Sequence, residues 1–223
     1  DFIVVGDLFG HVWKIDISST NKLNWGFSST ANSSPQPFYS ASACSGESCD
    51  TSNSQPITSK IQVRRHPTSA GYLLFFGTGK YLEKGDSSAN DQTTQSFYAL
   101  WDQAENSLTS FDRSNLLKQE IIKEVTVSGS DFRVTTANTI DWSTHKGWYI
   151  DLVNTGVTPT DNLGERQVND AIIINGKLIF TTLVPSDNPC DFGGSSWLME
   201  LDAYSGSRLE QSFFDLDNNN VVN

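Results

Sequence analysis

The sequence predicts an all-β fold, and within that class it favours part of a modified β-propeller with long insertion loops. Apolar residues come mostly in short runs bounded by Gly, Asn, Asp, Ser or Pro, and helical periodicity is scarce. A weak repeat recurs, in which an aromatic residue leads an apolar strand that closes on Asp before a polar turn: Trp13–Asp16, Tyr98–Asp102, Trp148–Asp151 and Trp197–Asp202. The last two intervals are about fifty residues, the range of propeller blades. A β-sandwich with a core of aromatic residues is the alternative, and the pattern favours the propeller.

The strands follow from these runs in chain order. We expect one hairpin of Ile3–Val5 with Val12–Ile17 around the turn Gly6–Gly10, and a second of Ile172–Ile174 with Leu178–Leu183. Further strands are expected at Tyr72–Phe76, Phe97–Trp101, Trp148–Leu152 and Trp197–Leu201. The segment Ser114–Val125 is ambiguous, because its apolar residues also fit one side of a helix. In each repeat we expect the aromatic residue to pack against a neighbouring blade and the Asp to tie the following turn.

Composition excludes several classes of partner. The 223 residues are 37% hydrophobic, enough for a sizeable core. Acidic residues outnumber basic ones by 26 to 15, which gives a formal net charge of −11. Nucleic acids and anionic membranes select clustered Lys and Arg, so neither is expected as the main partner. No apolar run reaches the length of a membrane span, so the chain is not expected to be membrane-spanning.

Residues 28–54 form a Ser/Asn/Cys-rich stretch that we interpret as an insertion loop. It contains Cys44 and Cys49, and a short-loop disulfide between them, implying an oxidising compartment, is the preferred interpretation. A metal-binding cysteine pair is the alternative, although no second pair or nearby His supports it. Cys190 is the third cysteine, and the sequence leaves its partner open.

Several short motifs indicate structure rather than catalysis. His11, His66 and His145 are far apart, and surface or capping roles are expected for them. Gly77–Lys80 lacks the spacing of a phosphate-binding loop and predicts a tight turn. Arg64-Arg65-His66 predicts a salt bridge in a loop. Ser195 and Ser196 lack the following Gly of a nucleophile elbow, so no catalytic residue and no enzyme activity is predicted.

The last nine residues predict a calcium-binding loop. Oxygen-bearing side chains stand at every second position in Asp215, Asp217 and Asn219, and again at Asn223, while Val221 falls where a backbone carbonyl would serve as ligand. Calcium is a hard cation that takes several oxygen ligands at once, and loops supply them with this alternating spacing. A solvated Asp/Asn turn is the alternative.

Seven runs of the sequence, taken in order, resemble the C-terminal propeller domain of the PilC/PilY-type proteins associated with type IV pili. They are Gly6–Asp16, Gln55–Thr58, Phe76–Leu82, Gln95–Asp102, Gly147–Leu152, Gly164–Arg166 and Asn188–Leu198. The resemblance implies a single propeller region over residues 1–223, which is a fragment of a larger exported protein at the cell surface. It also implies a calcium loop at 215–223, in which Asn223 replaces the usual closing Asp and Asn220 a common Gly.

The resemblance further implies a non-enzymatic function at the pilus tip: assisting pilus biogenesis, opposing retraction, and adhering to surfaces. The expected partners are pilus minor subunits and a host or abiotic surface. Two alternatives stay open, a quinoprotein-like propeller enzyme and a purely structural cell-surface module whose Asp turns serve folding alone.

Overall fold

The computed structural model describes residues 1–31, 34–44, 51–88, 93–103, 111–127, 129–157, 162–186, 188 and 194–210. These residues form strands and four short 3-10 segments, at Lys22–Asn24, Thr51–Asn53, Lys84–Ser87 and Arg113–Asn115, and none of them forms an α-helix. The all-β prediction is therefore confirmed.

The strands form three main sheets. The N-terminal sheet contains β1 (Phe2–Gly6), β2 (His11–Asp16), β3 (Gly26–Phe27) and β6 (Tyr39–Ser40). The central sheet has the order β11-β10-β12-β9-β8-β7, with β7 at Gln62–Arg65, β8 at Tyr72–Gly77, β9 at Ser96–Asp102, β10 at Leu117–Val127, β11 at Ser130–Thr135 and β12 at Gly147–Asn154. The C-terminal sheet contains β13 (Ile172–Ile174), β14 (Lys177–Thr181) and β17 (Leu198–Asp202). Two small hairpins pair β4 (Thr30–Ala31) with β5 (Ser34–Pro35) and β15 (Val184–Pro185) with β16 (Gly194–Ser195).

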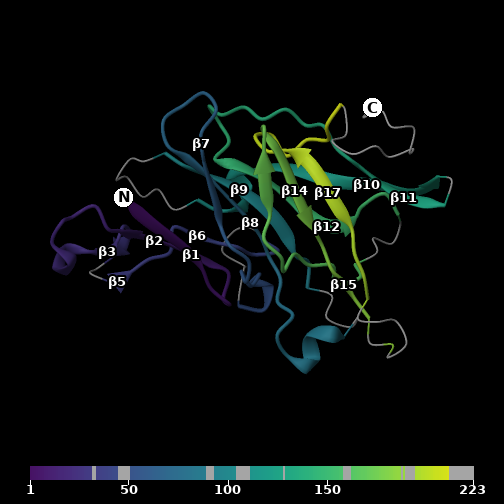
Figure 1. Ribbon diagram of the computed structural model, residues 1–223, viewed down its shortest axis with the longest axis horizontal. Helices are drawn as coiled ribbons and strands as arrows, with labels where there is room; N and C mark the ends of the chain where they lie inside the picture. Colours follow the sequence, from purple (N-terminus) through teal and green to yellow (C-terminus); the bar gives the residue numbers. More distant parts are fainter. Residues whose placement is uncertain are drawn as a thin grey trace.

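These three sheets are stacked face to face, with the central sheet in the middle (Figure 1). Alternation along β8 shows this directly, because Leu73 and Phe75 belong to one core cluster while Leu74 and Phe76 belong to the other. Strand β9 alternates in the same way. A strand buried on both faces needs a continuous apolar run, which is what the predicted strands at 72–76 and 97–101 contain.

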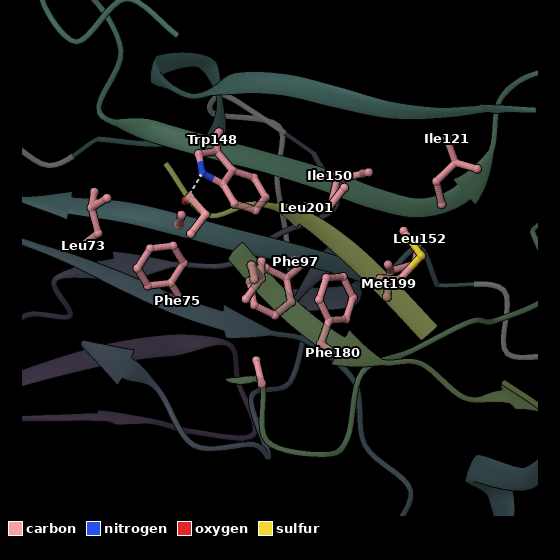
Figure 2. Close-up of a cluster of buried hydrophobic side chains, with 14 residues drawn as sticks. Leu73, Phe75, Phe97, Ile121, Trp148, Ile150, Leu152, Phe180, Met199 and Leu201 are labelled. Atoms are coloured by element: carbon pink, nitrogen blue, oxygen red, sulfur yellow. Dashed lines mark hydrogen bonds between the residues drawn. The ribbon is translucent and has the colours of Figure 1, made fainter. Parts of the chain in front are cut away.

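The core between the central and C-terminal sheets is built around aromatic rings (Figure 2). Phe97 of β9 and Phe180 of β14 stack with ring centroids 4.4 Å apart. Trp148 of β12 is fully buried, and its indole Nε1 donates to the carbonyl of Ala203 at 3.0 Å, just after β17. The repeated aromatic at Trp148 thus packs against the neighbouring sheet, as the repeat predicts.

The predicted N-terminal hairpin is confirmed, with β1 and β2 paired antiparallel from Phe2↔Asp16 to Gly6↔Val12. Asp7 fixes the turn, since its Oδ1 accepts from the amides of Phe9 and His11 at 2.8 and 2.9 Å. Its other oxygen accepts from Trp13 Nε1 at 2.8 Å. Partial burial opposes ionisation of Asp7, but these hydrogen bonds outweigh it and lower its pKa. The second predicted hairpin, β13 with β14, is also confirmed.

The helical alternative for Ser114–Val125 is wrong, because most of this segment lies in β10. Strand β10 pairs in parallel with β12 and antiparallel with β11, and its register shifts between Ile121 and Lys123. Up to this shift the strand keeps its period-two alternation, so Ile121 is buried while Ile122 is 38% exposed. Leu116 and Leu117 likewise pack into different core clusters, so the adjacent apolar pairs of this segment face opposite sides of the sheet, although the same spacing also fits one side of a helix.

The Asp residues of the repeat divide into two kinds. Asp16 and Asp202 tie the turns that follow them, through hydrogen bonds from the backbone amides of Ser18 and Ser205, both at 2.8 Å. Asp151 lies within β12 and forms an ion pair with Arg113, so the predicted turn-tying role is wrong at this position. Asp102 forms an ion pair with Lys14, and the turn that follows it lies largely outside the described residues, so its role there stays a prediction.

Candidate functional site

The predicted calcium ligands Asp215, Asp217, Asn219, Val221 and Asn223 lie outside the described residues. Within the described part of the chain, no group of three or more His, Cys, Asp or Glu residues is arranged to hold a metal ion. The donor set itself suits calcium, because two carboxylates, two amide oxygens and one carbonyl are all hard oxygen ligands. The calcium loop therefore remains a prediction.

The segment that leads into this loop is described, and it is hydrogen-bonded to its neighbours. We call residues 207–210 the stem. Arg208 forms an antiparallel bridge with Leu201 of β17, and its backbone amide donates to the carbonyl of Thr136, which follows β11, at 3.1 Å. Its guanidinium also lies 3.4 Å from the carbonyl of Thr135. The stem is thus joined to both the central and the C-terminal sheet.

The turn between β17 and the stem is fixed by its sequence. Asp202 Oδ1 accepts from the amides of Tyr204 and Ser205 at 3.0 and 2.8 Å. Gly206 has φ of 70°, in the left-handed region where glycine carries no steric penalty. A Cβ at Gly206 would stand 2.4 Å from the Trp148 ring, so glycine is also needed for close packing. The direction in which the stem leaves β17 is therefore set by this turn.

A groove of about 670 Å³ lies between β11 and β17, and the stem forms part of its wall. We call it the β11–β17 groove. Arg133 dominates its polar side, with the guanidinium carbon 4.1 Å from the centroid of the Trp197 ring. Two nitrogens of Arg133 pair with the two carboxylate oxygens of Glu165, both at 2.6 Å, and its Nε donates to Glu124 at 2.7 Å. Two acidic partners thus neutralise this buried cation and hold it in place.

A second polar cluster lies between the N-terminal and central sheets, around Arg113. Its guanidinium donates to Asp151 at 2.8 Å and to the hydroxyls of Ser96 and Tyr98, both at 2.6 Å. The same group lies 4.3 Å above the ring of Tyr149. Burial opposes the charge on Arg113, but Tyr98 and Asp151 outweigh it and raise the pKa of the guanidinium. The arrangement keeps a permanent cation and suits structural cross-linking rather than proton transfer.

The predicted capping role is confirmed for His66. Its Nδ1 accepts from the amides of Thr68 and Ser69 at 3.3 and 2.9 Å. The ring is buried rather than on the surface, between Trp101 and Trp142 with centroids 4.4 and 4.3 Å away. Burial lowers the pKa of His66, so the ring is held neutral.

Two short-motif predictions are wrong. Arg64 and Arg65 end strand β7 instead of lying in a loop, and the Arg64 guanidinium donates to the carbonyl of Val63 at 3.0 Å. Gly77–Lys80 is not a tight turn, because β8 runs through Gly77 and Gly79 forms a parallel bridge with Ile57.

Cys44 is disulfide-bonded, which excludes it as a free thiolate ligand and overturns the metal-pair alternative. Its two candidate partners, Cys49 and Cys190, both lie outside the described residues.

The stacked sheets, the repeated aromatic strands and the groove beside the stem place the chain among β-propeller-type domains. It belongs to the PilY1 β-propeller domain family, whose model matches residues 1–137. The solved C-terminal domain of PilY1 from Pseudomonas aeruginosa superposes on all of this chain with a TM-score of 0.76 at 30% identity, and the chain covers 48% of that domain.

Curated relatives agree with this assignment. The type IV pilus biogenesis factor PilY1 of Pseudomonas aeruginosa PAO1 is 31% identical over the whole chain, which spans 21% of that protein. A homolog of the same factor from Xylella fastidiosa Temecula1 is 32% identical over 92% of the chain, which spans 13% of it. The chain therefore spans about a fifth or less of these relatives.

Sequence reasoning missed the residues that organise both polar clusters. Glu165 lies in the Gly164–Arg166 run that carried the resemblance, but its partner Arg133 is 32 positions away. Arg113 likewise stands 38 positions from Asp151. The available signal was the placement of single charged residues beside strong strand patterns, which suggests buried ion pairs without identifying the partners.

Proposed function

We propose that this chain is a non-enzymatic, calcium-binding propeller module of an exported protein at the tip of type IV pili. In this proposal the protein acts in pilus biogenesis, opposes retraction and adheres to host or abiotic surfaces, together with pilus minor subunits. The relatives are named as type IV pilus biogenesis factors, which supports the pilus role. Within the described residues, no helix is long and apolar enough to cross a membrane.

The stem supports the calcium part of the proposal. Nine residues with alternating oxygen donors begin five positions beyond Glu210, the last described residue. The stem before them is hydrogen-bonded to both sheets through Arg208. Calcium bound at Asp215–Asn223 would restrain the chain that follows the stem, while the stem itself is held by its hydrogen bonds. The metal would thereby stabilise the β11–β17 groove and set the conformation of the module.

Isothermal titration with calcium tests this proposal, on a polypeptide extended beyond Asn223 so that the loop is followed by its natural sequence. We expect measurable binding below millimolar calcium, abolished by Asp217→Ala because a carboxylate ligand is lost. Asn218→Ala is the matched control, since position 218 falls between ligand positions and should leave binding intact. An absence of heat at millimolar calcium, or equal binding by both variants, would contradict the proposal.

Two alternatives are separated by further measurements. Equal thermal stability with calcium and with chelator would favour a purely structural module. A quinoprotein-like enzyme would show cofactor absorbance or turnover after addition of a quinone cofactor.

A further inference from the structure

The turn between β13 and β14 is an Asn-Gly dipeptide, Asn175-Gly176, and the sequence contains no other Asn-Gly pair. The two residues have φ of 50° and 78°, as both central residues of a two-residue type I′ turn require. Among the described residues, Asn175 is the one non-glycine residue with a positive φ. The hairpin is therefore closed by a dipeptide whose asparagine side chain stands next to a backbone amide without steric protection.

Both groups that could react in this turn are accessible. Asn175 is exposed, and within the described part of the chain neither its side-chain amide nor the backbone amide of Gly176 forms a hydrogen bond. Gly176 has no Cβ that would keep its nitrogen away from the Asn175 side chain. Strand β13 has three residues and lies at the edge of its sheet, so opening of this end of the hairpin breaks few hydrogen bonds.

We propose that Asn175 is a site of spontaneous covalent modification, in which its side-chain amide is converted to a carboxylate. The backbone nitrogen of Gly176 loses its proton and attacks Cγ of Asn175. The new Cγ–N bond closes a five-membered succinimide ring, and the Cγ–Nδ2 bond breaks with release of ammonia. Water then opens the ring at one of its two carbonyl carbons. The product is either aspartate with the normal backbone or isoaspartate, in which the main chain passes through the former side chain, and water is the only co-reactant.

The two products should differ in their effect on the fold. Aspartate tolerates a left-handed backbone and occurs before glycine in type I′ turns, so it should keep the hairpin. Isoaspartate inserts one additional methylene into the main chain between positions 175 and 176. A two-residue turn has no room for this extra atom while Ile174 stays paired with Lys177, so the closing pair of the hairpin should break.

The hairpin turn is joined to the 202–206 turn, so the disruption should extend beyond the hairpin. The amide of Ala203 donates to the carbonyl of Gly176 at 2.8 Å, and the carbonyl of Ala203 accepts from Trp148 Nε1 at 3.0 Å. A Cβ placed on Gly176 would lie 3.2 Å from the Tyr204 ring, so this ring packs closely against the hairpin turn. Isoaspartate at position 175 should therefore displace the residues that pack around Trp148 and direct the stem.

Peptide mapping by mass spectrometry of the natural, longer polypeptide tests the modification. During incubation in mildly alkaline buffer, we expect Asn175 to be converted no more than roughly 100-fold more slowly than the asparagine of a free Ile-Ile-Asn-Gly-Lys peptide, because the turn opens at low cost. Asn24 is the internal control, since it is also exposed but is followed by the bulky Trp25, and it should stay unmodified over the same period. A slower conversion of Asn175 than this limit, or equal conversion of Asn175 and Asn24, would overturn the inference.

Thermal unfolding and tryptophan fluorescence of the incubated protein test the structural consequence. The fraction that an isoaspartyl methyltransferase labels should have a Tm lower by roughly 2–4 °C and an altered tryptophan emission. Asn175→Gly is the matched control, because Gly-Gly keeps the type I′ turn and cannot form the succinimide, so its Tm should not change on incubation. Fresh Asn175→Asp should also keep its Tm.

An equal loss of Tm in incubated Asn175→Gly, or the full loss in fresh Asn175→Asp, would show that isoaspartate is not the cause and would overturn this consequence. Neither measurement involves calcium or pili, so the outcome is independent of the proposed function.

Discussion

Replacing Arg113 by Met should destabilise the protein strongly, because it leaves Asp151 without its cation. The Arg113 side chain is 7% exposed and that of Asp151 is 17% exposed, so water can compensate only in part. The substitution also removes hydrogen bonds to Ser96 and Tyr98 and the contact with the Tyr149 ring. Breaking a buried ion pair by removing one partner costs about 3–5 kcal/mol, and the partial exposure of Asp151 favours the lower end.

A loss of about 3 kcal/mol corresponds to a decrease in Tm of about 6–12 °C for a chain of this size. Thermal and urea unfolding under non-reducing conditions measure it, since Cys44 is disulfide-bonded. Asp151→Asn removes the charge that Arg113 neutralises. The double variant Arg113→Met/Asp151→Asn should therefore lose at least about 1 kcal/mol less free energy of unfolding than the sum of the two single losses. Lys118→Met is the control: its pair with Glu120 is 2.7 Å long but exposed, and such pairs contribute about 0–1 kcal/mol. A cost below about 1 kcal/mol for Arg113→Met, or strict additivity of the two substitutions, would refute this reasoning.

Three further substitutions test other contacts. Burial lowers the pKa of His66 in the folded protein below the ordinary imidazole value of 6.5. Neutral His66 therefore stabilises the folded state above pH 6.5, and this stabilisation is lost as pH falls through the lower pKa of the folded state. In His66→Asn the thermal stability should depend less on pH over this range. Glu165→Ala should cost about 3 kcal/mol in urea unfolding, because Arg133 loses its bidentate partner in a buried site. Gly206→Ala would place a Cβ 2.4 Å from the Trp148 ring at a residue with φ of 70°. The substitution should lower the free energy of unfolding by about 1–3 kcal/mol, and displacement of the Trp148 ring should shift tryptophan fluorescence.

Each of these variants has a matched control in the same chain. His145→Asn should keep the pH dependence, because His145 is outside the aromatic cluster. Glu124→Ala removes the more exposed partner of Arg133, 32% exposed against 4% for Glu165, and should cost less. Gly129→Ala has a similar φ of 83° but open space around the new Cβ, so it isolates backbone strain from the clash. Equal effects of a variant and its control would contradict the corresponding contact.

The strands that could be predicted are those whose apolar residues and turn residues are close together in the sequence. The β1–β2 hairpin could be predicted because the turn Gly6–Gly10 separates two apolar runs. Asp7, within this turn, accepts a hydrogen bond from the Phe9 amide and so stabilises it. Strand β10 could not be assigned in the same way, because its register shifts between Ile121 and Lys123 against β11 and between Gln119 and Ile121 against β12. A turn that is stabilised by its own residues can be predicted from the sequence, whereas a strand register that depends on distant partner strands cannot.

The same distinction applies to the sites. The calcium loop stays a prediction, and it could be formulated because all its proposed donors fall within nine consecutive residues. The β11–β17 groove could not be predicted, because its walls come from segments sixty or more positions apart in the chain, Asp131–Thr135 and Ser195–Glu210. Lys14 and Asp102 pair across 88 positions, and neither residue carries any local sign of the other. Long-range ion pairs of this kind are decided by the stacking of the sheets, which a single sequence does not specify.

In the proposed function, the position of the stem determines where bound calcium would act. Arg208 joins the stem to β11 and β17 by backbone contacts, while the Arg113 cluster lies on the other side of the central sheet. Restraint of residues 215–223 by a metal would therefore be felt first at the β11–β17 groove, and only through the packed central sheet at the N-terminal hairpin. Because packed sheets deform little, the response to calcium should be concentrated in the groove. The groove is therefore the surface at which the proposed calcium binding is expected to act.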